Sequence, residues 1–216
     1  GTPVAGALRQ KIHHSCRQIL RFVLPDGSVA LLGDGCYPFF HETVNQDIAN
    51  IQNISRALFP ADRFPSSNPA DCVASDIYPY IVATRAADML IADVGNIGLR
   101  NNPGHGHSDL LSFIYCSRGI TIMLDPGTRA YTNDPESLRL KKADSHNTIT
   151  VDNADHARLW GYFRWAFLPD DPSYTATCCC HGFSLAAQYT GFKHIGGITH
   201  RRVFCLKPDE LLIEDR

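Results

Sequence analysis

The stretch from Thr199 to Ile213, THRRVFCLKPDELLI, contains the pattern that decides the fold. Two short runs of β-branched, aromatic and aliphatic residues flank Pro208-Asp209, a pair that is typical of a tight turn. Because two strands joined by so short a turn must run antiparallel, the stretch predicts a β-hairpin.

Similar runs recur upstream at short intervals, separated by Gly, Pro, Asp and Asn. They span residues 78–83, 89–94, 110–115, 120–124, 148–151, 163–167, 174–179 and 183–189. Many short strands at this spacing favour an all-β domain with antiparallel sheets. We therefore expect a mainly β protein whose antiparallel β-sandwich domain covers residues 73–216. The last run stops without a turn, so we expect this domain to be truncated at its C-terminal end.

The first part of the chain has a different periodicity. Apolar or small residues recur every three to four positions over 6–23 and again over about 42–58, which predicts two amphipathic helices. Pro25-Asp26-Gly27 supplies a turn after the first helix. Residues 60–75 are rich in Pro, Ser, Asp and Asn, a composition typical of a linker. Two helices with no partner helices, and no Met at the start, predict a piece of a longer protein.

Composition and charge exclude several classes of protein. A formal net charge of -2 gives no general attraction to nucleic acid. A chain with 44% hydrophobic and 19% charged residues is typical of a globular protein, and no apolar run is long enough to span a membrane. The eight cysteines contain no CxxC pair, so we expect mostly buried thiols and no zinc ribbon, while a disulfide stays open.

The segment most informative about chemistry is GHGHSDLLSF, residues 104–113. His105 and His107 are two positions apart, so on an extended chain their side chains lie on the same face, and Asp109 continues that face.

Further ligand-type residues follow at strand boundaries. Asp125 ends a run in LDPGT, and His146 begins another in SHNTITVD. Two histidines and one carboxylate, completed by water, are a suitable ligand set for Zn²⁺. The same set suits Fe²⁺ in a cupin-like oxygenase, and ordinary hydrogen-bonded histidines are a third interpretation.

In this order, GHGHSDLLSF, LDPGT with Tyr131 shortly after it, and SHNTITVD resemble the signature of the heparinase II/III-like polysaccharide lyases. HRRVFCLKPDELLIEDR, from His200, resembles the strand pair that follows in that family, and LPDGSVALLGDG, from Leu24, resembles a loop near the end of its helical toroid. The resemblance covers nearly the whole chain. It implies that residues 1–65 are the tail of an α/α toroid that precedes the β-sheet domain.

The resemblance also implies an activity and a set of site residues. Members of the family cleave uronate-containing polysaccharides by β-elimination. By position in the motifs, His105 lies in the active cleft, while His107, Asp125 and His146 bind Zn²⁺ and thereby fix the loop that carries His105. Tyr131 is a second candidate for a catalytic role in the cleft. The family's main catalytic Tyr and its Asn or His partner lie upstream, in the toroid.

The expected partner is an anionic uronate polysaccharide, and the expected location is periplasmic or secreted. Which polysaccharide is cleaved, and whether the protein is a homo-oligomer, stay open. The alternatives are a cupin-like non-haem iron oxygenase and a non-catalytic glycan-binding module. Arg139, Lys141 and Lys142 could face an anionic sugar, but a solvated face of a helix is the expectation. Trp160 and Trp165 could stack on sugar rings, but ordinary packing is expected for them.

Overall fold

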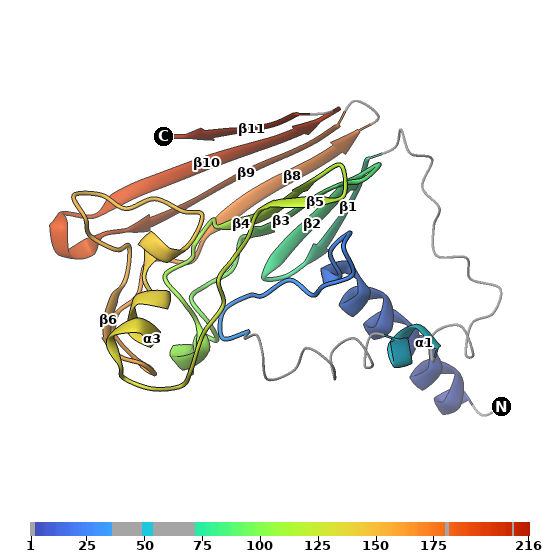
Figure 1. Ribbon diagram of the computed structural model, residues 1–216, viewed down its shortest axis with the longest axis horizontal. Helices are drawn as coiled ribbons and strands as arrows, with labels where there is room; N and C mark the ends of the chain where they lie inside the picture. Colours follow the sequence, from blue (N-terminus) through green and yellow to red (C-terminus); the bar gives the residue numbers. More distant parts are fainter. Residues whose placement is uncertain (1–2, 36–48, 54–71, 180–181, 209) are drawn as a thin grey trace.

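The computed structural model describes residues 3–35, 49–53, 72–179, 182–208 and 210–216, and most of them form β-structure (Figure 1). One sheet is an antiparallel meander in the order β1-β2-β3-β4-β5, with β1 (Cys72–Ile77), β2 (Tyr80–Arg85), β3 (Asp88–Asp93), β4 (Phe113–Ser117) and β5 (Ile120–Met123). A second antiparallel sheet has the order β11-β10-β9-β8, with β8 (Ser173–Cys179), β9 (Gly182–Gly191), β10 (Ile198–Lys207) and β11 (Glu210–Asp215). A separate hairpin contains β6 (Arg158–Gly161) and β7 (Arg164–Phe167).

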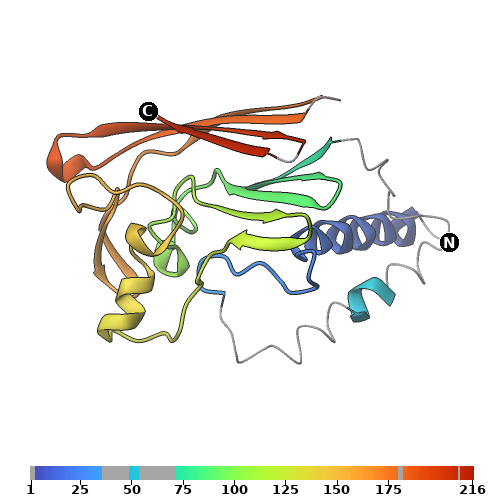
Figure 2. The same ribbon diagram turned by 45° about the horizontal axis from the view of Figure 1, so that its top comes forward.

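The two larger sheets pack face to face as a sandwich, seen as two layers in Figure 2. The core between them joins Leu90 and Phe113 of the first sheet to Leu185 and Phe204 of the second, and the rings of Phe113 and Phe204 are 5.4 Å apart between centroids. In the final hairpin, Lys207 pairs with Glu210, as the Thr199–Ile213 pattern predicts. The mainly β, antiparallel sandwich predicted from the sequence is thereby confirmed.

The first sheet is also covered on its outer face. Leu24 and Ala30 pack there against Val82, Ile91 and Ile114. Every residue of β3 is buried, because alternate side chains enter the core between the sheets and the cluster beneath the N-terminal segment. This packing fixes the segment that leads to Asp34, which becomes important at the functional site.

The N-terminal helix α1 (Pro3–Ile19) continues into a short 3-10 turn, η1 (Leu20–Phe22). It starts and ends close to the predicted 6–23. Cys16 is buried, whereas Leu8, Ile12 and Ile19 are exposed. Residues 49–53 are helical, in agreement with the middle of the predicted second helix, and the remainder of that helix lies outside the described residues.

Three local expectations were wrong. Residues 148–151 form only an isolated bridge, Val151 to Ala154, because side chains hold this segment instead: Thr148 donates its hydroxyl to the Leu110 carbonyl. Strand β1 begins at Cys72, inside the predicted linker, since pairing with β2 outweighs the local composition. Strand β6 was missed, because its four residues form a strand only by pairing with β7.

Among the described cysteines, Cys16, Cys116, Cys178 and Cys205 are free thiols. Cys16 and Cys116 are buried, Cys72 and Cys205 are partly buried, and Cys178 is exposed. The expectation of buried thiols therefore holds for two of them and fails for Cys178. No helix among the described residues is both long and apolar enough to cross a membrane.

Candidate functional site

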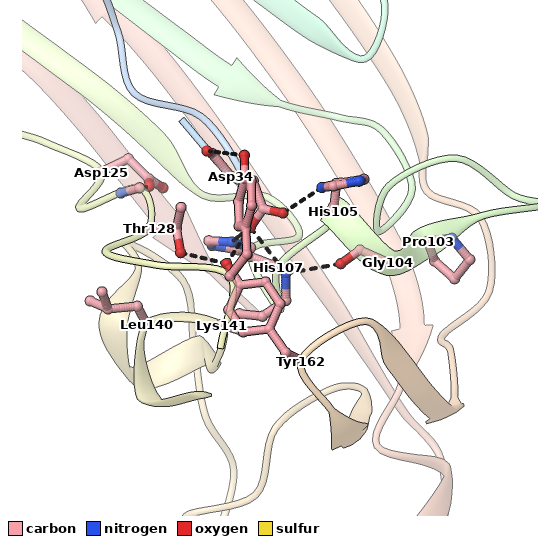
Figure 3. A network of polar contacts seen from close by, with 12 residues as sticks. Asp34, Pro103, Gly104, His105, His107, Asp125, Thr128, Leu140, Lys141 and Tyr162 are labelled. Atoms are coloured by element: carbon pink, nitrogen blue, oxygen red, sulfur yellow. Dashed lines mark hydrogen bonds and ion pairs between the residues drawn. The ribbon is translucent and has the colours of Figure 1, made fainter. Parts of the chain in front are cut away.

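The motif residues gather around one buried carboxylate, that of Asp34 (Figure 3). Four segments far apart in the sequence meet there: the loop after residue 30, the short turn η2 (Pro103–His105) with the residues that follow it, the end of helix α3 (Pro135–Leu140), and the turn between β6 and β7. The side chain of Asp34 is only 7% exposed, so its charge must be satisfied by the protein.

Each oxygen of Asp34 accepts hydrogen bonds. Oδ2 is 2.7 Å from Nδ1 of His105. Oδ1 is 3.0 Å from Nε2 of His107, 3.2 Å from Nζ of Lys141 and 2.9 Å from the hydroxyl of Tyr162. Burial alone would raise the pKa of Asp34, but the hydrogen bond from His107 and the charge of Lys141, with Tyr162 and His105, lower that pKa to about 2. Asp34 is therefore an ionised acceptor at neutral pH.

An ionised carboxylate fixes which ring nitrogen of each histidine carries the proton. His105 must donate from Nδ1, so its Nε2 carries the lone pair when the ring is neutral. The His105 side chain is 62% exposed. A basic nitrogen is thus held in one orientation at the surface of the site, which is the geometry that a general base or acid requires.

The same reasoning gives the opposite result for His107. Its Nε2 donates to Asp34, which leaves the lone pair on Nδ1. That Nδ1 is fully buried and has no hydrogen-bond partner among the described residues. The ring lies beside that of His146, with 5.2 Å between centroids. A buried nitrogen lone pair without a donor is unfavourable by itself, and this atom is therefore suited to bind a metal ion.

His146 has a matching arrangement. Its Nε2 donates to the carbonyl of Leu140 at 2.9 Å, so Nδ1 faces Oδ2 of Asp125 at 2.8 Å. These two acceptor atoms need a proton or a shared metal ion between them. Burial lowers the pKa of His146, but the hydrogen bond to Asp125 and the charge of Asp109 outweigh burial and raise it.

Among the described residues, the ligand atoms that lie within 4.8 Å of one another belong to His107, Asp109 and His146. Asp125 adjoins this cluster through His146, and the backbone N–H of Gly127 holds its other oxygen at 2.9 Å. The structure thus brings His107 and His146 of the expected set together with Asp109, whereas Asp125, the third expected ligand, contacts His146 but lies outside that cluster. Burial, and then repulsion from Asp109, raises the pKa of neighbouring Asp93, as expected where carboxylates crowd without a cation.

Lys141 was expected on a solvated face, and that expectation was wrong. Its side chain is fully buried, with Nζ 3.1 Å from the Gly104 carbonyl and 4.4 Å from the centroid of the Tyr162 ring. The positive charge compensates that of Asp34, because an unpaired buried carboxylate would be costly. Lys142, the next residue, is exposed as expected.

Tyr131 lies beside His105, with 5.8 Å between ring centroids, and it is 55% exposed. Its hydroxyl donates to the backbone carbonyl of Asp34 at 3.5 Å, a long hydrogen bond. Phe163 completes the group, with its ring 5.5 Å from that of His105. The structure therefore places the two predicted catalytic residues next to each other and open to solvent.

The second glycine of GHGH, Gly106, lies where another part of the backbone approaches too closely for a side chain. A Cβ on Gly106 would lie 2.3 Å from the backbone nitrogen of Gly98, whereas a Cβ on Gly104 would come no closer than 3.2 Å to its nearest neighbour, the Phe163 carbonyl. We expect Gly106→Ala to lower the free energy of unfolding by about 1–3 kcal/mol, because backbone must move. Gly104→Ala is the matched control and should have a smaller effect. Thermal unfolding of both variants tests this, and equal melting temperatures would contradict it.

Sequence reasoning missed Asp34 and Tyr162. Asp34 lies in LPDGSVALLGDG, a stretch that resembled a family loop but offered no ligand spacing. Its partners are 71 to 128 positions away, and no local pattern reports such contacts. The glycine of LDPGT is a sequence feature that is consistent with this contact. Gly127 has φ +60, and a Cβ there would lie 2.0 Å from the carbonyl oxygen of Gly35. The turn at Gly127 therefore packs closely against Gly35, the residue next to Asp34.

The family model described as "Heparinase II/III-like, C-terminal" matches residues 78–216. The chain belongs to this family. The match includes the GHGH, DPGT and HNT motifs, so the family resemblance inferred from them is confirmed. None of the curated sequences compared with the chain matches it significantly.

Two solved structures support the fold of this heparinase II/III-like chain. A mutant of the heparan sulfate lyase HepC from Pedobacter heparinus has a TM-score of 0.60 and 12% identity, over 92% of this chain and 31% of its own. A heparinase III with methylated lysines has a TM-score of 0.62 and 15% identity, over 90% of this chain and 30% of its own. The chain thus spans under one third of the length of these proteins.

Proposed function

We propose that this chain supplies the β-domain side of the active cleft in a polysaccharide lyase that cleaves a uronate-containing polymer by β-elimination. One observation carries the proposal: Asp34 accepts a hydrogen bond from Nδ1 of His105, whose largely exposed ring is thereby held beside the ring of Tyr131. Family membership supports lyase chemistry over a cupin-like oxygenase.

The reaction needs one base and one acid. The proton leaves C5 of the uronate, the C4–O4 bond breaks, a C4=C5 double bond forms, and the leaving O4 takes a proton. His105 and Tyr131 are candidates for these proton transfers, because both present titratable atoms at the same opening. Lys141 and Tyr162 keep Asp34 ionised and in place, and so keep the His105 tautomer fixed.

We also propose that His107 and His146 bind Zn²⁺ together with Asp125, and that Asp109 lies close enough to join or replace Asp125. The buried lone pair of His107 and the facing acceptors of His146 and Asp125 support this proposal. Asp34 would be the carboxylate behind a metal-binding histidine. When bound, the ion would cross-link the motif segments, so that its main contribution is to hold the loop that carries His105.

Elemental analysis tests the metal proposal. We expect about one zinc per chain. Removal of the metal with a chelator should lower the melting temperature, because the cluster would then hold unpaired buried acceptors. Asp125→Asn and Asp109→Asn, compared for zinc content, identify the carboxylate ligand. Iron in place of zinc would contradict the proposal and favour the oxygenase alternative.

Two wider expectations remain part of this proposal. Residues 1–65 would belong to the end of a helical toroid, and the 92% coverage of this chain by a much longer lyase structure agrees with that. The protein would work in the periplasm or outside the cell, where such polymers occur. Incubation of the full-length protein with heparan sulfate, chondroitin sulfate and alginate tests the function, with the absorbance of the unsaturated product as readout. Binding to a polymer with no product from any of them would favour a non-catalytic glycan-binding module.

A further inference from the structure

A surface hollow lies next to the site, between helix α3 and the β6–β7 hairpin. Its volume is about 370 Å³, and it is lined by Pro135, Leu138, Arg139, Lys142, Leu159, Trp160 and Gly161. Figure 1 shows these two elements together at the lower left of the molecule. The lining combines apolar surface with two cations and contains no carboxylate.

The two tryptophans of the hairpin behave differently. Trp165 is partly buried and donates its indole N–H to the Pro103 carbonyl at 3.0 Å, so packing explains it. Trp160 is 74% exposed, against the expectation of ordinary packing. A large aromatic ring left open to solvent forgoes the free energy of burial, and its apolar face remains free to stack on a ligand.

Positive charge surrounds this ring. The guanidinium of Arg164 lies 5.7 Å from the Trp160 ring centroid. Arg139 is already engaged by Glu136 at 2.8 Å. The Lys142 ammonium, in contrast, makes no hydrogen bond or close ion pair among the described residues, and a longer-range attraction to the Asp155 carboxyl leaves it able to bind an anion.

The hollow is also close to the proposed reactive groups. Trp160 is three residues from Phe163, whose ring contacts that of His105, so the chain between them spans at most roughly 10 Å. A polymer seated on Trp160 would thus reach His105 within a few sugar units. Tyr162, between the two, is the residue whose hydroxyl donates to Asp34.

We propose that this hollow is a binding subsite for an anionic sugar unit, with the apolar face of the sugar ring on Trp160 and its carboxylate or sulfate at Lys142. The subsite rests on the proposed function, because its ligand is the polymer that the lyase cleaves. It would hold the chain of sugars next to the reactive groups without touching the bond that breaks.

Binding is measured by calorimetry with the full-length protein carrying His105→Ala, so that cleavage is slow compared with the measurement. The probes are heparan sulfate, chondroitin sulfate and alginate, with the neutral glucan dextran as control. For the polymer bound most tightly, Trp160→Ala should raise Kd roughly 5- to 30-fold, as for loss of an aromatic anchor. Trp160→Phe should retain most of the affinity. Lys142→Ala should raise Kd about 2- to 5-fold, less at high salt.

Lys207→Ala is the matched control for charge. Lys207 ends β10 at the opposite end of the molecule and should leave Kd unchanged (Figure 1). The subsite would be overturned by unchanged affinity in Trp160→Ala or by equal losses of affinity in Lys142→Ala and Lys207→Ala. It would also be overturned if dextran bound equally well, or if no anionic polymer bound. If binding depends on Trp160 but the protein with His105 intact forms no unsaturated product, the subsite would be retained and the lyase function rejected.

Discussion

Replacing Asp34 with Ala should remove most turnover of the full-length protein and also destabilise it. The side chain accepts hydrogen bonds from His105, His107, Lys141 and Tyr162, so its loss frees the His105 ring and leaves the buried Lys141 charge unpaired. Removing one partner of a buried ion pair lowers the free energy of unfolding by about 3–5 kcal/mol. Loss of a correctly oriented base or acid lowers kcat by roughly 10² to 10⁴.

Asp34→Asn separates the two effects, because the amide keeps the size of the side chain while it removes the charge. We expect that variant to bind zinc roughly 10- to 100-fold more weakly, as is typical when the carboxylate behind a metal-binding histidine is altered. Asp26→Ala is the control: Asp26 lies on the same segment, but it is exposed, and its carboxylate accepts from the N–H and hydroxyl of Ser28 rather than from residues of the site. Normal kcat and melting temperature in Asp34→Ala would show that Asp34 has no role at the site.

His105→Ala and His107→Ala should fail in different ways, although the two residues are two positions apart. His105 is largely exposed and His107 is fully buried, while both donate to the same carboxylate. His105→Ala should keep its zinc and its melting temperature but lose roughly 10² to 10⁴ in kcat. His107→Ala should lose zinc and melt at a lower temperature, and its activity should fall as a consequence.

Zinc content, melting curves and kcat, measured on the same preparations, check this division. His194→Ala is a suitable control, since His194 lies in the connection between β9 and β10, where its ring contacts Phe167 at 5.1 Å between centroids. Equal loss of zinc in the His105 and His107 variants would mean that both histidines bind the metal. Near-normal turnover by His105→Ala would remove it from the reaction.

The sequence predicts the sheets well because alternation and turn residues are local signals. The runs at 89–94, 174–179 and 183–189 correspond closely to β3, β8 and β9. The failures lie where side chains replace backbone pairing, as at Thr148, or where a short strand depends on its partner, as in β6. Pairing energy of this kind depends on distant residues, and local patterns do not contain it.

At the site, the sequence identifies several of the residues that take part, but not which partner each of them contacts. The order of the motifs selects His105, His107, Asp125 and His146, and the structure links them in a chain of contacts. Asp34 contacts His105 and His107, the ring of His107 lies beside that of His146, and His146 contacts Asp125. Lys141 was misjudged because a lysine on a short helix is usually solvated, and only the buried charge of Asp34 explains its burial. Asp34 itself has no local signature, since the packing of the preceding segment on the outer face of the sheet positions it.

If His105 takes part in an elimination reaction, the chemistry of the cleaved polymer ends must show it. The full-length protein and its His105→Ala variant are incubated with uronate polymers in ¹⁸O-labelled water, and the products are examined by absorbance and mass spectrometry. We expect unsaturated uronate ends that contain no solvent oxygen, formed at a strongly reduced rate by the variant. Saturated ends with incorporated ¹⁸O would show hydrolysis, and unsaturated ends formed equally fast by both proteins would exclude His105 from the reaction.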